Sequence, residues 1–175
     1  MRRLVIAVVA ALALTMVGAG SVSAHSGKQV RVIGGNSFKA NQFVKSTFRF
    51  APGKITVDRG DKVTFVDRDQ DADEPHTATI VNQADLPTTF DEVFECEVCN
   101  DALAAHDPGN DGQPPFNLVV NKGNPGLDTP GDSLLFGGSD LDQSIRARVT
   151  APAGTTLYYL CAIHPWMQGS IKVRR

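Results

Sequence analysis

The fold and chemistry of this chain are decided by residues 157–169, LYYLCAIHPWMQG. The apolar and aromatic run that opens this stretch is typical of a buried β-strand. The strand ends at Cys161, and a loop then presents His164 and Met167 before another strand begins near Gly169. A thiolate, an imidazole and a thioether therefore stand close together between two strand ends, which hold them still.

Each of these side chains has an ordinary structural interpretation on its own. A lone buried cysteine is usually a small hydrophobe, and a lone methionine usually fills a gap in a core. Their combination at Cys-x2-His-x2-Met spacing favours a metal site instead. Two His and one Cys in a plane, with a weak axial Met, form the blue-copper geometry, so one more histidine is needed upstream. We expect His76, at the head of another predicted strand, to supply it; the alternative is an ordinary strand-start residue.

The loop resembles the ligand loop of the cupredoxins, the group of plastocyanin, azurin and amicyanin, and its short spacing is most similar to amicyanin. Residues 48–66 add to the likeness, because two alternating strands flank a Gly-Asp turn. The resemblance implies an all-β, antiparallel Greek-key sandwich or barrel of seven or eight strands. It also implies one type-1 copper ion, with the ligands His76, Cys161, His164 and Met167.

The same resemblance implies roles for three neighbours of the ligands. Amicyanin-like chains usually have Asn where this one has Thr77, and the Thr77 hydroxyl is expected to tie the two ligand loops together from the second coordination shell. His164 is expected to be the electron port, framed at the docking surface by Pro165 and Trp166. Trp166 either contacts a partner or fills the core beside the copper, and both interpretations stay open.

The first 24 residues have the pattern of a secretory signal peptide. Arg2 and Arg3 precede an apolar run over residues 4–17, and small residues lead up to Ala24. Cleavage after Ala24 predicts a periplasmic or extracellular protein, and an uncleaved membrane anchor is the alternative. Cleavage also makes His25 the new N-terminus, where a copper-chelating role is less favoured than an ordinary terminal residue.

The mature region, residues 25–175, has the length of a single domain. Without Arg2 and Arg3 the formal charge changes from −2 to −4, since no acid lies before Ala24. No basic cluster is present, which argues against nucleic acid and anionic membranes as partners. Residues 67–74 carry alternating Asp, which we interpret as a solvated acidic loop. A calcium loop would require Gly and Glu where Ala72 and Ala78 stand.

The middle of the chain departs from the resemblance. His76 and Cys161 are 85 positions apart, which predicts an insertion at about residues 82–140. Thr89 opens a capping box, and apolar residues at helical spacing follow it. The sequence therefore predicts one amphipathic helix over residues 90–106, followed by a stretch that is mostly loop.

The predicted helix carries Cys96, Cys99 and His106. A disulfide between the two cysteines suits an exported protein with three cysteines, one of them a copper ligand. A second metal site is an alternative, although Cys99 and His106 lie about 10 Å apart along an unbroken helix. A thioredoxin-like redox pair is the third interpretation, and it lacks a surrounding βαβ pattern.

The favoured function is single-electron transfer between redox partners such as a cytochrome or a dehydrogenase, by a monomer that is not an enzyme. Multicopper enzymes need many more imidazoles than the four histidines of this chain. A copper carrier or sensor of the same fold is the alternative, because the same ligands could hold copper for delivery.

Overall fold

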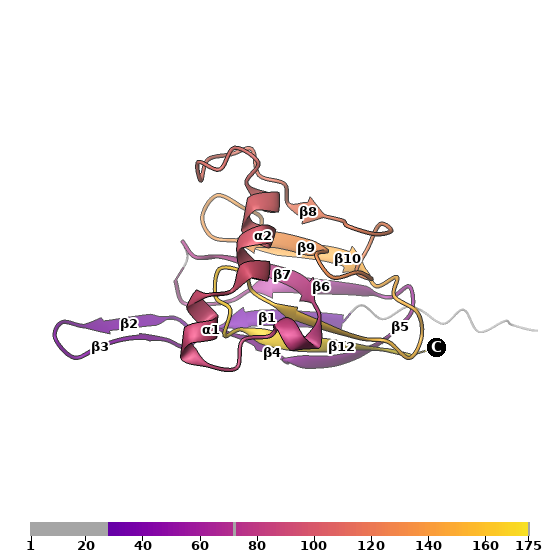
Figure 1. The fold of residues 1–175 in the computed structure, drawn as a ribbon, viewed down its shortest axis with the longest axis horizontal. Coiled ribbons are helices and arrows are strands. Elements are labelled where there is room, and N and C mark those ends of the chain that lie inside the picture. The colour runs from indigo at the N-terminus through magenta and orange to yellow at the C-terminus, as the bar shows by residue number, and fades with distance from the viewer. Residues whose placement is uncertain (1–27, 72, 175) are drawn as a thin grey trace, which may run out of the picture.

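The computed structural model describes residues 28–71 and 73–174, and this part of the chain consists mainly of β-strands (Figure 1). The predicted signal peptide and His25 lie outside the described residues. None of the helices in the described ranges is both long enough and apolar enough to cross a membrane.

Two sheets form the body of the molecule. The four-stranded sheet has the order β10-β6-β1-β4, and the six-stranded sheet has the order β5-β12-β11-β7-β9-β8. The bounds of these strands are β1 Lys28–Ile33, β4 Arg49–Ala51, β5 Lys54–Asp58, β6 Lys62–Asp67, β7 Pro75–Val81, β8 Val119–Val120, β9 Ser133–Gly137, β10 Ser144–Arg148, β11 Thr156–Leu160 and β12 Gln168–Arg174.

Most neighbouring strands are antiparallel, as predicted, but β1 pairs with β6 and β5 with β12 in parallel. Neighbours such as β7 and β11 are far apart in the sequence. The chain therefore crosses between the two sheets, as a Greek-key arrangement requires. The all-β sandwich predicted from the sequence is confirmed, with more strands than the expected seven or eight.

The main core lies between the two sheets. Alternate residues point into it, among them Val30 and Val32 of β1, Ile80 of β7 and Tyr159 of β11, all of which are buried. This alternation follows from the period of two along a strand, which separates the faces of a sheet. Burial of this apolar surface stabilises the sandwich.

The outer face of the six-stranded sheet is covered by helices (Figure 1). After the 3₁₀ turn η1, Gln83–Asp85, come α1, Phe90–Phe94, and α2, Glu97–His106. The predicted capping box at Thr89 is present, with Glu92 as its reciprocal partner. The single helix expected over residues 90–106 is instead divided, because Cys96 adopts an extended conformation as the N-cap of α2.

A second, smaller core joins α2 to this sheet. Cys99 and Ala102 of α2 pack with Val81 of β7 and Leu160 of β11. The sheet is consequently buried on both faces beneath the helix, and β7 is buried at every residue after Pro75. Side chains that point outward from β7 therefore lie in the protein interior.

Two parts of the fold differ from the sequence-based expectation. The stretch expected as an insertion, residues 82–140, contains β9, which pairs with β7 over five residues of the main sheet. A hairpin of β2, Asn36–Lys39, and β3, Phe43–Ser46, was not anticipated. It projects away from the sandwich in Figure 1 and exposes 74% of Phe38.

Candidate metal centre

The loop between β11 and β12 is closed on itself by main-chain hydrogen bonds. The Cys161 amide donates to the Met167 carbonyl over 3.0 Å, and the Met167 amide donates to the His164 carbonyl over 2.8 Å. These bonds hold the three side chains that the sequence singles out at the end of the sheet. Cys161, His164 and Met167 are all buried, and Cys161 and Met167 belong to the main core.

His76 reaches the same place from the adjacent strand. It lies at the start of β7, which pairs with β11, and it has no exposed surface. The Cys161 sulfur lies 3.9 Å from His76 Nδ1 and 3.7 Å from His164 Nδ1. The three donor atoms all lie within 4.8 Å of one another. The structure thus brings together His76, Cys161 and His164 as predicted.

The spacing of these donors fits a single metal ion. Thiolate and imidazole bonds to zinc, about 2.3 and about 2.0 Å long, place the two donor atoms about 3.7 Å apart at a trigonal angle of about 120°. The observed sulfur–nitrogen separations of 3.9 and 3.7 Å match this value. Two imidazoles and one thiolate are the planar donor set of blue-copper sites.

The acid–base state of Cys161 favours metal binding, whereas the raised pKa of His76 means that a metal must displace the proton of this ring. Burial raises the pKa of the Cys161 thiol, but the hydrogen bonds and charges of His164 and His76 outweigh burial and lower the pKa to about 6. At neutral pH the sulfur is therefore a thiolate, the form that binds metals. Burial lowers the pKa of His76, but interactions with Cys161 and Asp69 raise it by more, so the net shift is upward.

Each imidazole turns its other nitrogen towards a carboxylate. His76 Nε2 lies 2.7 Å from Asp69 Oδ2, and both side chains are almost fully buried. His164 Nε2 lies 3.5 Å from Glu74 Oε2, nearer the surface. Carboxylates in this position fix the tautomer of a metal-binding histidine and increase its basicity. The Nδ1 atoms are thereby left free to face the Cys161 sulfur.

The acidic segment is only partly the solvated loop that the sequence suggests, because Arg68, Gln70 and Asp73 are exposed but the side chain of Asp69 is almost fully buried. Asp67 is buried, and its carboxylate accepts from the Asp69 amide over 3.0 Å. A Cβ atom on Gly137 would lie 2.5 Å from the Asp67 carboxylate, and Gly137 has a φ of +80°, which favours glycine. The loop is folded against the end of β9, and this holds Asp69 beside His76.

An aromatic ring packs against both histidines. The Phe48 centroid lies 5.2 Å from that of His76 and 4.8 Å from that of His164. Phe48 is only 2% exposed. Together with the two carboxylates it restricts water and ring motion around the donors. No sequence pattern places Phe48 beside the two histidines, because its contacts depend on how the segment just before β4 packs across the sandwich.

Thr77 contacts both ligand loops. Its backbone amide donates to the Cys161 sulfur over 3.3 Å, and its hydroxyl accepts from the Ala162 amide over 2.7 Å. These are the contacts that the expected role of Thr77 requires.

The arrangement now identifies the fold, because a two-sheet sandwich carries the Cys, His and His donors at one end and a Met closes the ligand loop. The fold is that of the cupredoxins. No model of a known protein family matches the sequence, and no curated protein matches it.

Solved cupredoxins resemble the chain in structure. Auracyanin A, a blue copper protein from Chloroflexus aurantiacus, is 19% identical with a TM-score of 0.44, over 85% of this chain and 100% of its own. A purple cupredoxin from Nitrosopumilus maritimus is 15% identical with a TM-score of 0.41, over 83% and 98%. Plastocyanin from Dryopteris crassirhizoma is 21% identical with a TM-score of 0.40, over 83% and 99%.

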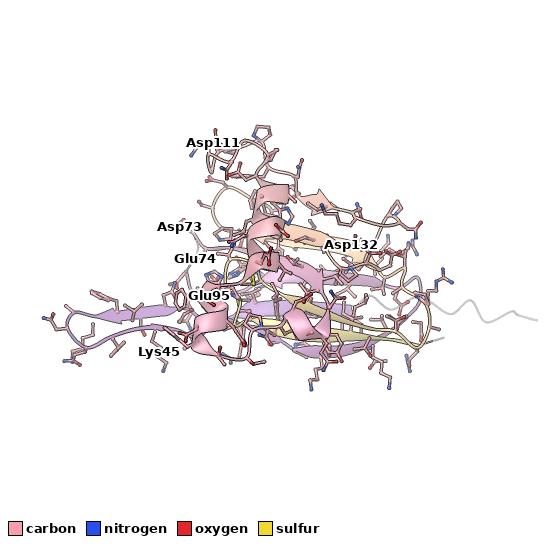
Figure 2. The ribbon with its side chains drawn as sticks, viewed as in Figure 1. Lys45, Asp73, Glu74, Glu95, Asp111 and Asp132 are labelled. Carbon is pink, nitrogen blue, oxygen red and sulfur yellow. A yellow bond between two sulfur atoms is a disulfide. The ribbon has the colours of Figure 1, made fainter. Side chains whose placement is uncertain are left out.

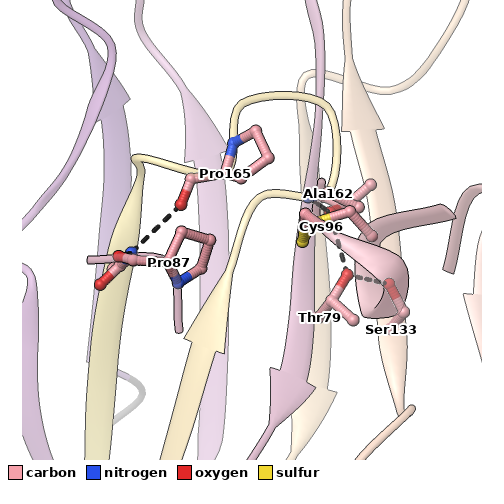
Figure 3. Close-up of a disulfide and its surroundings, with 9 residues drawn as sticks. Thr79, Pro87, Cys96, Ser133, Ala162 and Pro165 are labelled. Atoms are coloured by element: carbon pink, nitrogen blue, oxygen red, sulfur yellow. Dashed lines mark hydrogen bonds between the residues drawn. A yellow bond between two sulfur atoms is a disulfide. The ribbon is translucent and has the colours of Figure 1, made fainter. Parts of the chain in front are cut away.

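The helical segment of this protein carries a disulfide beside the ligand loop. Cys96 and Cys99 are joined, with their Cα atoms 5.3 Å apart, and both are buried in the second core with Ala162. Figure 3 shows Cys96 next to Ala162. His106 does not join them, because its two ring nitrogens lie against Asn117 and Ser133.

The expected docking surface is only partly exposed. Trp166 is 41% exposed, and its ring lies 5.2 Å from that of His164. Pro165 differs from the expectation, because it is buried. The side-chain amide of Gln168 donates hydrogen bonds to the carbonyl oxygens of Pro165 and Pro87 (Figure 3). Pro87 lies shortly before α1 in the chain. Pro165 therefore belongs to the packed part of the ligand loop and not to its exposed surface.

Proposed function

We propose that this protein carries single electrons by means of one type-1 copper ion, bound by His76, Cys161 and His164 with Met167 as the weak axial ligand. The observation that carries the proposal is the trio of donors: both sulfur–nitrogen separations match a trigonal angle at one ion, and all three donor atoms lie within 4.8 Å of one another. A copper ion bound there supplies a one-electron couple between Cu(II) and Cu(I).

The surrounding residues suit rapid electron transfer. Asp69 and Glu74 orient the imidazoles, and the Thr77 amide donates to the Cys161 sulfur. Phe48 and the burial of the donors exclude water. The ligands are held by the fold itself, so they need to move little when the charge of the site changes by one.

The alternative of a copper carrier or sensor requires ligands that release the metal easily. The burial of His76 and Cys161, both with no exposed surface, argues for a closed site instead. Measured exchange with a small cytochrome, compared with copper transfer to an apo-acceptor, separates the two functions.

The proposal is tested by adding Cu(II) to the reduced apo-protein. We expect an intense blue thiolate-to-copper band with one copper per chain. Cys161→Ser should abolish the band while circular dichroism shows an unchanged β-sandwich, because the core draws its stability from apolar burial. Met167→Gln should keep the copper and shift the reduction potential. A Cys161→Ser variant that remains intensely blue contradicts the assignment.

We further propose that the partner docks over Trp166 and α1. Phe94 lines a surface pocket together with Trp166, and the Phe94 and Phe90 rings lie 4.8 Å apart. Phe90 and Phe94 are 77% and 71% exposed. Apolar side chains this exposed, continuous with the ring of a metal-binding histidine, suit a contact site.

The charge of this region indicates a partner with a positively charged surface. Residues 69–121 contain twelve Asp and Glu and no Lys or Arg, whereas the rest of the described chain is basic overall. Glu74 and Glu95 lie on the same side of the molecule in Figure 2. Opposite charge steers association and makes its rate depend on salt.

The docking proposal is tested with stopped-flow exchange against basic and acidic cytochromes. The rate with the basic cytochrome should fall as salt increases, and Trp166→Ala or Phe94→Ala should slow it without changing the blue spectrum. Val119→Ala is the matched control, because Val119 is also exposed but lies on β8. Equal rates with both cytochromes contradict the charge argument. Export to the periplasm or cell exterior, and function as a monomer, remain part of the proposal.

A further inference from the structure

A buried chain of polar side chains connects α2 to the ligand loop. It begins at His106, the last residue of α2, which is 2% exposed. Thr77 and Thr79 of β7 and Ser133 of β9 point towards the helix from the outer face of the sheet, and each is at most 1% exposed. Without α2 these hydroxyls would face water.

The side chains form one continuous series of hydrogen bonds. His106 Nε2 lies 2.7 Å from Ser133 Oγ. Ser133 Oγ in turn lies 2.7 Å from Thr79 Oγ1, as Figure 3 shows. Thr79 Oγ1 lies 3.0 Å from Thr77 Oγ1, and this oxygen accepts from the Ala162 amide over 2.7 Å. The far end of the series is therefore the main chain directly after Cys161.

The direction of the hydrogen bonds follows from the two ends. His106 Nδ1 bonds the Asn117 carbonyl, which can only accept, so Nδ1 carries the proton. Burial lowers the pKa of His106 and favours the neutral ring, so Nε2 must accept from Ser133. Each hydroxyl has one proton, so Ser133 accepts from Thr79, and Thr79 accepts from Thr77.

We propose that His106 is a positioning residue for the metal centre, acting through Ser133, Thr79 and Thr77 on the ligand loop at Ala162. The proposal rests on the electron-transfer function proposed above. The lone pairs of Thr77 Oγ1 keep fixed directions only while the Thr77 hydroxyl donates its proton to Thr79 Oγ1. The orientation of Thr77 in turn determines how Ala162 and the adjacent Cys161 are held.

The consequence for the metal centre comes through the Cys161 sulfur. The Thr77 amide donates to this sulfur, and hydrogen bonding around a blue-copper thiolate tunes the reduction potential. The helical segment therefore acts on the metal centre without contributing a ligand. This gives His106 a role that neither a second metal site nor simple packing of α2 describes.

The first test uses the reduced apo-protein and needs no copper. Nitrogen-15 shifts of the His106 ring should show the Nδ1–H tautomer. Ser133→Ala and Thr79→Val each remove one link, and each should speed hydrogen exchange at the Ala162 amide about tenfold. Val98→Ala is the matched control, because Val98 belongs to α2 and packs against the second core outside the series. This change should leave the exchange rate at Ala162 unaltered, apart from any change in global unfolding.

The second test separates hydrogen bonding from packing at His106. His106→Gln keeps an oxygen that can accept from Ser133, so the exchange rate at Ala162 should stay near that of the wild type. His106→Leu removes the acceptor and should speed exchange about tenfold. In a Thr79→Val background the His106→Leu change should have no further effect on Ala162, because the series is already cut.

Several outcomes overturn the proposal. These are an Nε2–H tautomer, an Ala162 amide that is indifferent to Ser133→Ala and Thr79→Val, or an effect of His106→Leu that persists in the Thr79→Val background. In the copper-loaded protein, Ser133→Ala should shift the reduction potential and Val98→Ala should not. Absence of a blue band refutes the electron-transfer function alone, since the apo-protein measurements still decide the role of His106.

Discussion

The carboxylate of Asp69 is the most informative single group to change. Its Oδ2 lies 2.7 Å from His76 Nε2, while its Oδ1 accepts from the Asp71 amide over 3.0 Å. Asn at position 69 has only one oxygen, so it can satisfy one of these two donors and must turn an NH₂ group towards the other. Asp69→Asn therefore removes a charge and also disturbs the orientation of His76.

The magnitude follows from the burial and geometry of the pair. Loss of a partner that orients a metal-binding histidine costs about 10- to 100-fold in metal affinity, equivalent to about 1.4–2.8 kcal/mol. This range agrees with the worth of about 1.5–3 kcal/mol for a hydrogen bond to a charged group. Removing a negative charge also favours Cu(I). For each tenfold by which the loss of affinity for Cu(II) exceeds the loss for Cu(I), the reduction potential rises by about 59 mV.

The assay is a competition titration for Cu(II) affinity together with voltammetry of the loaded protein. Asp71→Asn is the matched control, because Asp71 lies in the same loop and its carboxylate bonds the Asn36 amide rather than a histidine. We expect weaker Cu(II) binding and a higher potential for Asp69→Asn only. If its affinity and potential equal those of Asp71→Asn, the reasoning from the Asp69–His76 pair is refuted.

Three further predictions concern stability and metal content. Burial lowers the pKa of His106 in the folded protein. The contribution of the neutral His106 ring to the free energy of unfolding is therefore complete above about pH 6.5 and is lost as the pH falls through the lower pKa of the folded state. The stability advantage of wild type over His106→Gln, measured by urea unfolding, should shrink over the same range. Gly169→Ala should cost about 1–3 kcal/mol in urea, because a Cβ would lie 2.3 Å from the Tyr159 ring. Cys96→Ser/Cys99→Ser should cost about 2 kcal/mol or less, because the loop is short, and should still bind one copper.

Each of these predictions has a clear contrary result. A constant difference between wild type and His106→Gln at all pH values would mean that His106 titrates alike in the folded and unfolded states. Unchanged stability of Gly169→Ala would mean that both the Tyr159 ring and the Gly53 carbonyl can move aside. Two metal equivalents in the wild type and one in the double cysteine variant would reveal a second metal site, and the carrier function would gain support.

The sequence by itself determined the class of fold and which side chains of the ligand loop are candidate donors. Cys161, His164 and Met167 lie in one short loop, so their proximity follows from spacing and needs no knowledge of packing. Strand alternation and the capping box at Thr89 are likewise local patterns, and the structure contains the elements that they predict. The Cys96–Cys99 pair is also local, since three positions separate its members.

Only the tertiary structure decided what surrounds these donors. Asp69 meets His76 because the acidic loop folds against β9, and charge patterning alone favoured a solvated loop. Pro165 is buried although its position in the loop suggested an exposed frame for His164.

The His106 connection was also beyond the reach of sequence patterns. It joins residues up to 85 positions apart, through the register that places Thr79 opposite Ser133 and through the seating of α2 on the sheet. Local patterns specify which groups a strand or helix presents. Which groups meet across elements depends on register and packing, and these are set by the fold as a whole.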